Sequence, residues 1–186
     1  MRVIGGRLGG QPLVAPRGRR TRPTPERVRE ALFSILASVD GMRVLDLYAG
    51  SGALGIEAVS RGAAELTLVD SGWGAVDAIT RNLRSLGVDA EVRRQTAASF
   101  LQHARGEQRQ YDLVFLDPPY SEAPRLGPSL SAGLVPLLSS QARVISESDR
   151  RAPLALELAG TLDERRYGDT LIRIHTLVPD NPSDGS

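Results

Sequence analysis

Apolar residues recur every three or four positions in the segment that follows residue 24, which is the spacing of one face of an α-helix. The members of this apolar stripe are Val28, Ala31, Leu32, Ile35, Leu36 and Val39. Thr24 suits the N-cap of such a helix, and Pro25 suits its first position because proline has no backbone N–H to leave unpaired. We therefore expect a helix that begins here and packs its apolar face against a sheet.

Apolar runs of strand length alternate with helical segments from residue 43 onward. The predicted strands cover residues 43–49, 65–70, 90–96, 111–117 and 142–148, and a final pair, 162–167 and 170–177, flanks the turn dipeptide Gly168–Asp169. The predicted helices between them cover residues 53–61, 73–86, 97–104 and 126–139. Such alternation is typical of an α/β fold with a mostly parallel, doubly wound sheet, which here ends in an antiparallel hairpin.

The two ends of the chain differ in composition from this central region. Residues 1–23 are rich in glycine, arginine and proline, and we expect them to form a basic arm with a short hairpin. Residues 24–178 are expected to form one domain, because their length suits a single core. Residues 179–186 are polar and without periodicity, and we expect a disordered tail there.

The net charge of +1 is unevenly distributed. Residues 1–30 hold eight arginines and two glutamates, a net charge of +6, so that the remainder carries −5. A basic arm on a mildly acidic body favours a polyanionic partner such as nucleic acid, although the same composition fits a solvated arm. The candidate contacts to RNA are Arg17, Arg19, Arg20 and Arg22.

The chain has no cysteine and two histidines, which excludes disulfides and cysteine nucleophiles and leads us to expect no metal site. No apolar run approaches the roughly 20 residues that a membrane-spanning helix needs. The first residues also lack the apolar segment of a signal peptide. We therefore expect a cytoplasmic, monomeric protein that works without a membrane.

A glycine-rich loop follows the first predicted strand. Gly50-Ser-Gly52-Ala-Leu-Gly55 fits the G-x-G-x-x-G pattern, opens a helix, and precedes a strand that ends in Asp70, whose carboxylate can accept hydrogen bonds from a ribose. Asp46, four residues before the loop, would repel a diphosphate but attract the ammonium group of S-adenosylmethionine. We therefore favour this cofactor over a nicotinamide dinucleotide, and the other interpretation of Asp46 is a cap on the next helix. The candidate cofactor-binding residues are Asp46, Gly50, Ser51, Gly52 and Asp70.

The sequence Asp117-Pro118-Pro119-Tyr120 ends the predicted strand 111–117. If the first strand is central, this strand lies next to it, and Asp117 comes close to the cofactor. The Asp117 carboxylate and the Pro118 carbonyl then accept the two N–H groups of an exocyclic amine, and Tyr120 offers a ring on which a base stacks. These three residues are the candidate catalytic residues. Because methylation at pyrimidine C5 generally uses a cysteine, nitrogen is the expected acceptor atom.

Several segments together resemble the bacterial 16S ribosomal RNA guanine-N2 methyltransferases of the RsmD family, which are class I S-adenosylmethionine-dependent methyltransferases with a [DNS]-P-P-[YF] motif. The segments are VIGG from Val3 with Arg7, RPTPERVREALF from Arg22, VLDLYAGSGALGIEA from Val44, DPPY from Asp117 and RYGDT from Arg166. The glycine loop and DPPY occur in many methyltransferases. The segment that begins at Arg22 narrows the resemblance to this family.

The resemblance implies a Rossmann-like sheet of seven strands with an antiparallel last strand. It also implies a substrate guanine in the 16S ribosomal RNA of the 30S subunit or its assembly intermediates, with the N-terminal arm near the RNA. At the end of the third strand, Thr96 stands where the family often has Asp or Asn beside the adenine amine, and the backbone of Ala97 is the alternative contact. Both residues are therefore further candidates for cofactor binding.

Together these features predict an enzyme that transfers a methyl group from S-adenosylmethionine to the N2 amine of a guanine in 16S ribosomal RNA. Two other functions remain open: a DNA adenine-N6 methyltransferase, and a non-catalytic ribosome-assembly factor that binds S-adenosylmethionine. The chain lacks the extra target-recognition domain that sequence-specific DNA methylation usually needs. The complete DPPY motif favours catalysis over a purely structural role.

Overall fold

The computed structural model describes residues 1–16 and 25–178 of the chain. The predicted cap Thr24, the tail 179–186 and the four candidate RNA contacts lie outside the described residues; these contacts are Arg17, Arg19, Arg20 and Arg22. No helix within the two described ranges combines the length and the apolarity that crossing a membrane requires.

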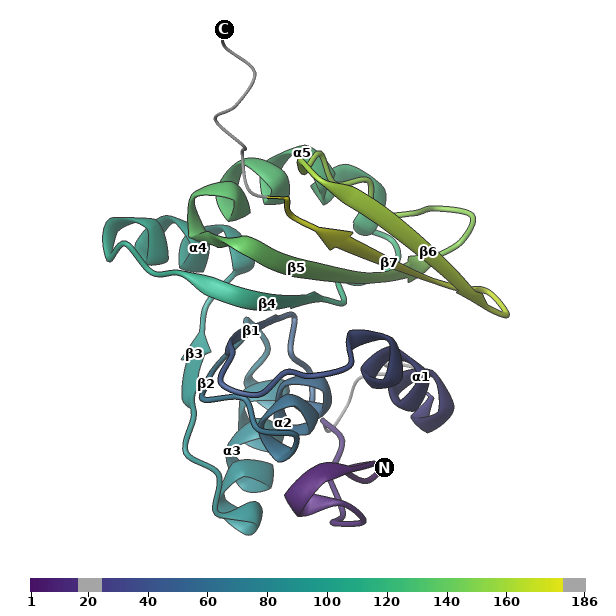
Figure 1. The fold of residues 1–186 in the computed structure, drawn as a ribbon. Coiled ribbons are helices and arrows are strands. Elements are labelled where there is room, and N and C mark those ends of the chain that lie inside the picture. Colours follow the sequence, from purple (N-terminus) through teal and green to yellow (C-terminus); the bar gives the residue numbers. More distant parts are fainter. Residues whose placement is uncertain (17–24, 179–186) are drawn as a thin grey trace, which may run out of the picture.

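In the described part of the chain, seven strands form one sheet in the order β3-β2-β1-β4-β5-β7-β6 (Figure 1). The strands are β1 Arg43–Leu47, β2 Glu65–Asp70, β3 Glu91–Arg94, β4 Tyr111–Leu116, β5 Leu138–Asp149, β6 Thr161–Tyr167 and β7 Thr170–Thr176. Strands β1 to β5 pair in parallel, and β7 runs antiparallel to both β5 and β6. The predicted Rossmann-like sheet with an antiparallel last strand is therefore confirmed, and its strand order reverses between β1 and β4.

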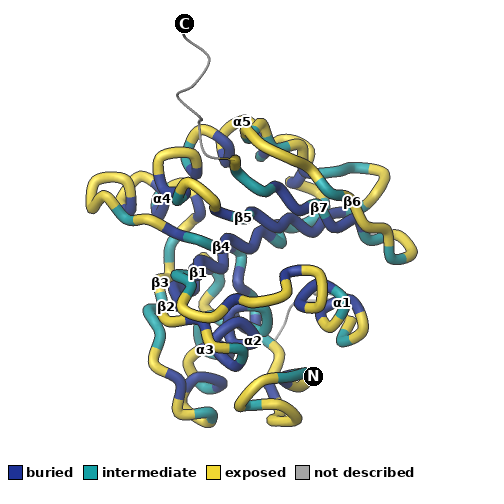
Figure 2. The backbone as a smooth tube through the Cα atoms, in the orientation of Figure 1, coloured by how far each residue is buried: buried dark blue, intermediate teal, exposed yellow. Residues whose placement is uncertain are grey.

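The helices cover both faces of this sheet. Within the described ranges they are α1 Glu26–Leu36, α2 Ala53–Ser60, α3 Trp73–Leu86, α4 Ala97–Gly106 and α5 Ala123–Leu134. Helices α1 to α3 pack on one face and helices α4 and α5 on the other, with the buried central strands between them (Figure 2). Because side chains alternate along a strand, Val44 faces the α2 side and Leu45 the opposite side. Asp46 therefore points toward α2 and the loop that starts it.

Several elements differ from their predicted ranges by a few residues. Strands β1, β3 and β4 end one or two residues early, where the chain turns into the loops at the carboxyl edge of the sheet. Helix α5 covers Ala123–Leu134 instead of 126–139. Pro124 lies in its first turn, where proline is tolerated, and Pro136 lies in the short 3-10 helix Val135–Leu137 that follows, before β5 begins at Leu138.

Helix α1 begins one residue later than predicted, and its buried face is rotated. Pro25 lies at the N-cap and Glu26 is the first helical residue. Ile35, which the apolar stripe predicted to be buried, is 39% exposed, whereas Arg29 is 1% exposed. The periodicity could not reveal this, because a charged residue in a helix is ordinarily assigned to the solvent side.

The first 16 residues dock on the α2 side of the domain. Val3 N–H donates to the Gln11 carbonyl and Leu13 N–H to the Met1 carbonyl, so that the segment folds back on itself. The two carboxylate oxygens of Glu57 accept hydrogen bonds from Ile4 N–H at 2.7 Å and from Gly5 N–H at 2.9 Å. The side chain of a buried glutamate in α2 thus holds the backbone of the arm.

Candidate active site

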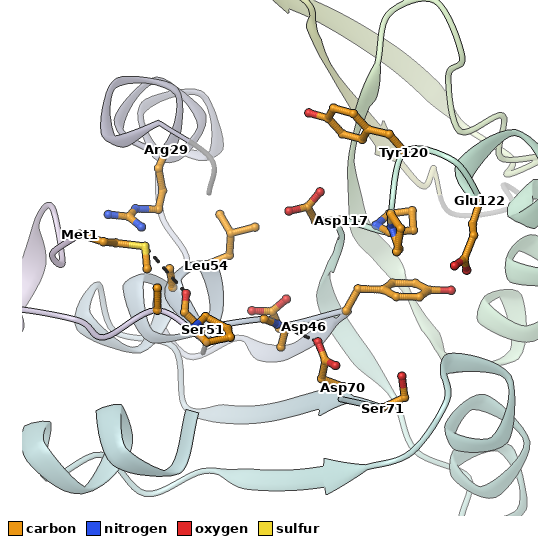
Figure 3. A pocket seen from close by; sticks show the side chains of 18 of the residues that line it. Met1, Arg29, Asp46, Ser51, Leu54, Asp70, Ser71, Asp117, Tyr120 and Glu122 are labelled. Carbon is orange, nitrogen blue, oxygen red and sulfur yellow. Dashed lines mark hydrogen bonds between the residues drawn. The ribbon is translucent and has the colours of Figure 1, made fainter. Parts of the chain in front are cut away.

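A cavity of about 550 Å³ opens at the carboxyl edge of the sheet, where β1 and β4 meet (Figure 3). In open α/β sheets, ligands bind at this edge, near the point where the strand order reverses. The described residues that line the cavity are Met1, Ala15, Pro16, Arg29, Asp46, Tyr48, Ala49, Gly50, Ser51, Ala53, Leu54, Asp70, Ser71 and the run from Asp117 to Glu122.

The glycine loop has a backbone that suits close approach by a ligand. Gly50 and Gly52 have φ values of +58° and +77°, in the left-handed region that glycine adopts without strain. Gly55 has a different role: a Cβ atom there would lie 2.6 Å from a methyl group of Leu66. The third glycine therefore lets α2 pack closely on the sheet, as in dinucleotide-binding folds.

Asp70 fixes the conformation of this loop from the end of β2. Its Oδ2 accepts from Gly50 N–H at 3.0 Å, and its Oδ1 accepts from Gly72 N–H at 2.8 Å. The side chain is 6% exposed and lines the cavity. Because a carboxyl oxygen can accept more than one hydrogen bond, Asp70 retains capacity to accept from the hydroxyl groups of a ribose.

Asp46 is buried in the floor of the cavity, and its Oδ2 accepts from Gly55 N–H in the first turn of α2 at 3.0 Å. Asp46 therefore accepts a hydrogen bond at the start of α2, as the alternative interpretation predicted. Its side chain also lines the cavity, where it can reach a ligand. Burial raises the pKa of Asp46 to about 7, against the lowering effect of the Gly55 hydrogen bond. Such a group ionises more readily beside a cation.

Asp117 follows the last residue of β4 and points into the cavity (Figure 3). Burial raises the pKa of Asp117 well above its ordinary value, and the negative charges of Glu147 and Asp46 raise it further. The hydroxyl of Tyr120 lies 3.5 Å from Oε1 of Glu147, a buried residue of β5. The cavity therefore concentrates carboxyl groups that a cationic ligand would stabilise in their ionised form.

The cavity brings together seven of the ten predicted site residues that the structure describes. Those that line it are Asp46, Gly50, Ser51, Asp70, Asp117, Pro118 and Tyr120. Gly52, Thr96 and Ala97 are not among its lining residues. The Thr96 hydroxyl accepts from Ser99 N–H at 3.2 Å and caps α4, and Ala97 is buried as the first residue of that helix. Their contact with the adenine stays a prediction.

Sequence reasoning missed several residues of the cavity, among them Arg29, Tyr48 and Glu122. Arg29 could not be predicted as a site residue because it lies on α1, far in the sequence from the glycine loop and from Asp117. Tyr48 has a φ of +62°, which is uncommon for a residue with a side chain and is typical of strained backbone at functional sites. Its place two residues before Gly50 of the glycine loop is the one signal that the sequence offered.

The lining of the cavity fits S-adenosylmethionine better than a dinucleotide. The carboxyl group of Asp46 suits the ammonium cation of this cofactor, and Asp70 suits its ribose diol. A pyrophosphate would meet the same carboxylates with the wrong charge. When bound, S-adenosylmethionine supplies an electrophilic methyl group at the carboxyl edge of the sheet.

The fold and this site define a Rossmann-like, S-adenosylmethionine-dependent methyltransferase. The solved structure of yhhF from Escherichia coli, provisionally named a methyltransferase, is 32% identical with a TM-score of 0.82 and covers 97% of this chain and 99% of that chain. SMU.776, a protein of the same fold that was crystallised in complex with SAH, is 16% identical with a TM-score of 0.65 and covers 81% of this chain and 48% of that chain.

The family described as "Conserved hypothetical protein 95" matches residues 1–176, and the chain belongs to this family, which is that of the RsmD-type methyltransferases. The chain is 35% identical over 180 residues to YlbH of Bacillus subtilis, provisionally named an rRNA methyltransferase, with 94% of this chain and 98% of that protein covered. It is 41% identical over 122 residues to ribosomal RNA small subunit methyltransferase D of Escherichia coli, and this match covers 64% of this chain and 60% of that protein.

Proposed function

We propose that the protein transfers a methyl group from S-adenosylmethionine to the exocyclic N2 amine of a guanine in 16S ribosomal RNA, within the 30S subunit or its assembly intermediates. The observation that carries this proposal is the Asp117–Pro118 corner, which faces the cavity at the end of β4. Relatives named for ribosomal RNA methylation support RNA as the substrate. The choice of guanine N2 follows the resemblance to the RsmD family. We further propose that the protein acts in the cytoplasm as a monomer.

The corner suits a guanine amine because such an amine is planar and weakly nucleophilic. The Asp117 carboxylate and the Pro118 carbonyl each accept one N–H, which supports a pyramidal nitrogen and aims its lone pair into the cavity. Once the nitrogen carries the methyl group, it is cationic and loses one proton, which the Asp117 carboxylate is placed to accept. Asp117 therefore needs to be ionised when the base arrives, and a neighbouring cofactor cation favours that state despite the raised pKa.

Tyr120 completes the proposed acceptor site. Its ring lies beside the corner and its hydroxyl lies 3.5 Å from Oε1 of Glu147 (Figure 3). A contact of the hydroxyl with Glu147 restricts the ring, and a ring held in this way offers a face on which an extruded base stacks.

Labelled methyl transfer to three acceptors in parallel tests this function: 30S particles, bare 16S ribosomal RNA and duplex DNA. We expect transfer to the 30S particles to be the fastest, and nuclease digestion of the product to yield N2-methylguanosine. In this proposal, recognition depends on the shape and phosphates of the particle. Preferred transfer to DNA, or a product methylated on adenine, would contradict the proposal.

The basic arm is proposed to contact RNA phosphates through Arg17, Arg19 and Arg20. Replacing all three with alanine is expected to weaken binding to 30S particles and to reduce the slope of log K against log salt by about 2–3, because each lost phosphate contact removes roughly 0.7–0.9 of that slope. Binding measured from low to high salt checks this. The matched control replaces three exposed arginines outside the cavity lining, Arg84, Arg105 and Arg125, with alanine. An equal change of slope in both triple variants would mean that binding depends only on the net charge of the protein, which would contradict a specific role of the arm.

A further inference from the structure

The guanidinium of Arg29 is buried at one end of the cavity, and its hydrogen bonds are incomplete. The residue is 1% exposed, lies on α1, and lines the cavity beside Met1 and Leu54 (Figure 3). Its Nη2 donates to the carbonyl of Arg2. Its Nε and Nη1 have no hydrogen-bond partner among the described residues.

Glu57 is the nearest carboxylate to Arg29, but it does not satisfy this cation. Its Oε2 lies 4.0 Å from Nε of Arg29, which is beyond hydrogen-bond distance. Both of its oxygens are engaged elsewhere, with the backbone N–H groups of Ile4 and Gly5 and with Nε of Arg61 at 2.8 Å. Burial accordingly lowers the pKa of Arg29, although Glu57 and Glu26 oppose this. A buried donor that is left unpaired destabilises the protein, and a ligand with an acceptor group would remove that penalty.

The charged side chains that line the cavity indicate which kind of ligand group can bind next to Arg29. The other charged side chains that line it among the described residues are the carboxylates of Asp46, Asp70, Asp117 and Glu122, and Arg29 is the only one with a cationic side chain. An anionic group would be repelled from every other charged side chain of that lining. S-adenosylmethionine and its product both carry one such group, the carboxylate of their amino-acid end.

We propose that Arg29 is the residue that binds the carboxylate of the cofactor's amino-acid end, through the donors that are unpaired on Nε and Nη1. With Arg29 at one end and Asp70 at the other, the cofactor can lie in the cavity in one direction only, with its amino-acid part toward α1 and its ribose toward β2. Arg29 also holds the Arg2 carbonyl, so the same side chain joins the N-terminal arm to the cofactor site. This role concerns cofactor binding and does not depend on whether RNA is the acceptor.

Calorimetric titration of the full chain with two ligands tests the proposal. The ligands are S-adenosylmethionine and decarboxylated S-adenosylmethionine, which keeps the ammonium and sulfonium groups and lacks the carboxylate. We expect the unmodified protein to bind the decarboxylated ligand about 10- to 100-fold more weakly, the range that a hydrogen bond between charged groups contributes. Arg29→Gln is expected to bind the two ligands with equal affinity, and Arg29→Lys to recover part of the preference.

The ratio of the two affinities separates a direct contact from a fault in folding, since a misfolded variant would lose both ligands together. The matched control is Arg61→Gln, which removes the arginine that donates to Glu57 and lies outside the cavity lining. We expect this control to keep the preference for S-adenosylmethionine. Equal binding of the two ligands by the unmodified protein, or a loss of preference in Arg61→Gln as large as in Arg29→Gln, would overturn the proposal.

Discussion

Replacing Asp117 with alanine is expected to lower kcat for methyl transfer by about 10²- to 10³-fold, while the Kd for S-adenosylmethionine stays within about threefold. The reason is that the carboxylate acts on the acceptor amine, whose positive charge develops only during transfer. Single-turnover transfer to 30S particles measures the first quantity, and calorimetry measures the second. We expect the kcat of Asp117→Asn to lie between that of the unmodified protein and that of Asp117→Ala, because the amide oxygen still accepts one N–H but carries no charge.

The two variants also report on the protonation state of Asp117. Because burial and the neighbouring carboxylates raise its pKa, neither substitution removes a favourable charge from the folded protein, and we expect neither to lower the thermal midpoint at pH 7.5 by more than a few degrees. If Asp117→Ala weakens S-adenosylmethionine binding as much as it slows transfer, Asp117 is a cofactor-binding residue instead.

The sequence was sufficient for the architecture because the fold depends on patterns that are local. Strand-length apolar runs and the helices between them predicted the order of elements along the chain. The placement of Asp117 near the cofactor assumed that the first strand is central, and β1 lies between β2 and β4 in the sheet. The Asp117–Pro118 corner lies beside Asp46 for the same reason: β4 pairs with β1, with Asp46 opposite Phe115. Topology thus places two of the predicted site residues together without any knowledge of side-chain contacts.

The residues that the sequence did not reveal are those whose role depends on packing between distant segments. Arg29 belongs to the cavity because α1 rotates its charged side chain inward, beside Glu57 of α2 and the Arg2 carbonyl of the arm. No periodicity predicts a buried cation, since the period identifies a face only by its apolar members. Thr96 is a residue that the sequence suggested for the site but that caps a helix. A hydroxyl at the end of a strand can bind a ligand or cap the next helix, and the hydroxyl of Thr96 caps α4.

Replacing Asp46 with asparagine is expected to stabilise the protein above pH 7 and to weaken S-adenosylmethionine binding about 10- to 100-fold. In the folded protein the pKa of Asp46 is about 7, compared with an ordinary value of 3.8, so the folded state holds its proton at pH values where the unfolded state has lost it. Stability therefore falls as the pH rises from about 4 to 7, by up to about 4 kcal/mol. Asparagine removes this penalty and keeps an oxygen for Gly55 N–H, but its amide donors need partners, so we expect a net gain of about 1–3 kcal/mol at pH 8.

Thermal unfolding at pH 4 and at pH 8 checks the sign, and the gain should be large at pH 8 and absent at pH 4. Asp112→Asn is the matched control, because Asp112 lies at the other end of β4 and accepts three hydrogen bonds from Arg43. This arginine lowers the pKa of Asp112, so the control should destabilise the protein at pH 8 and leave cofactor affinity unchanged. If Asp46→Asn also destabilises the protein at pH 8, Asp46 is ionised and well solvated in the free protein, and its burial does not prepare the site for a cation.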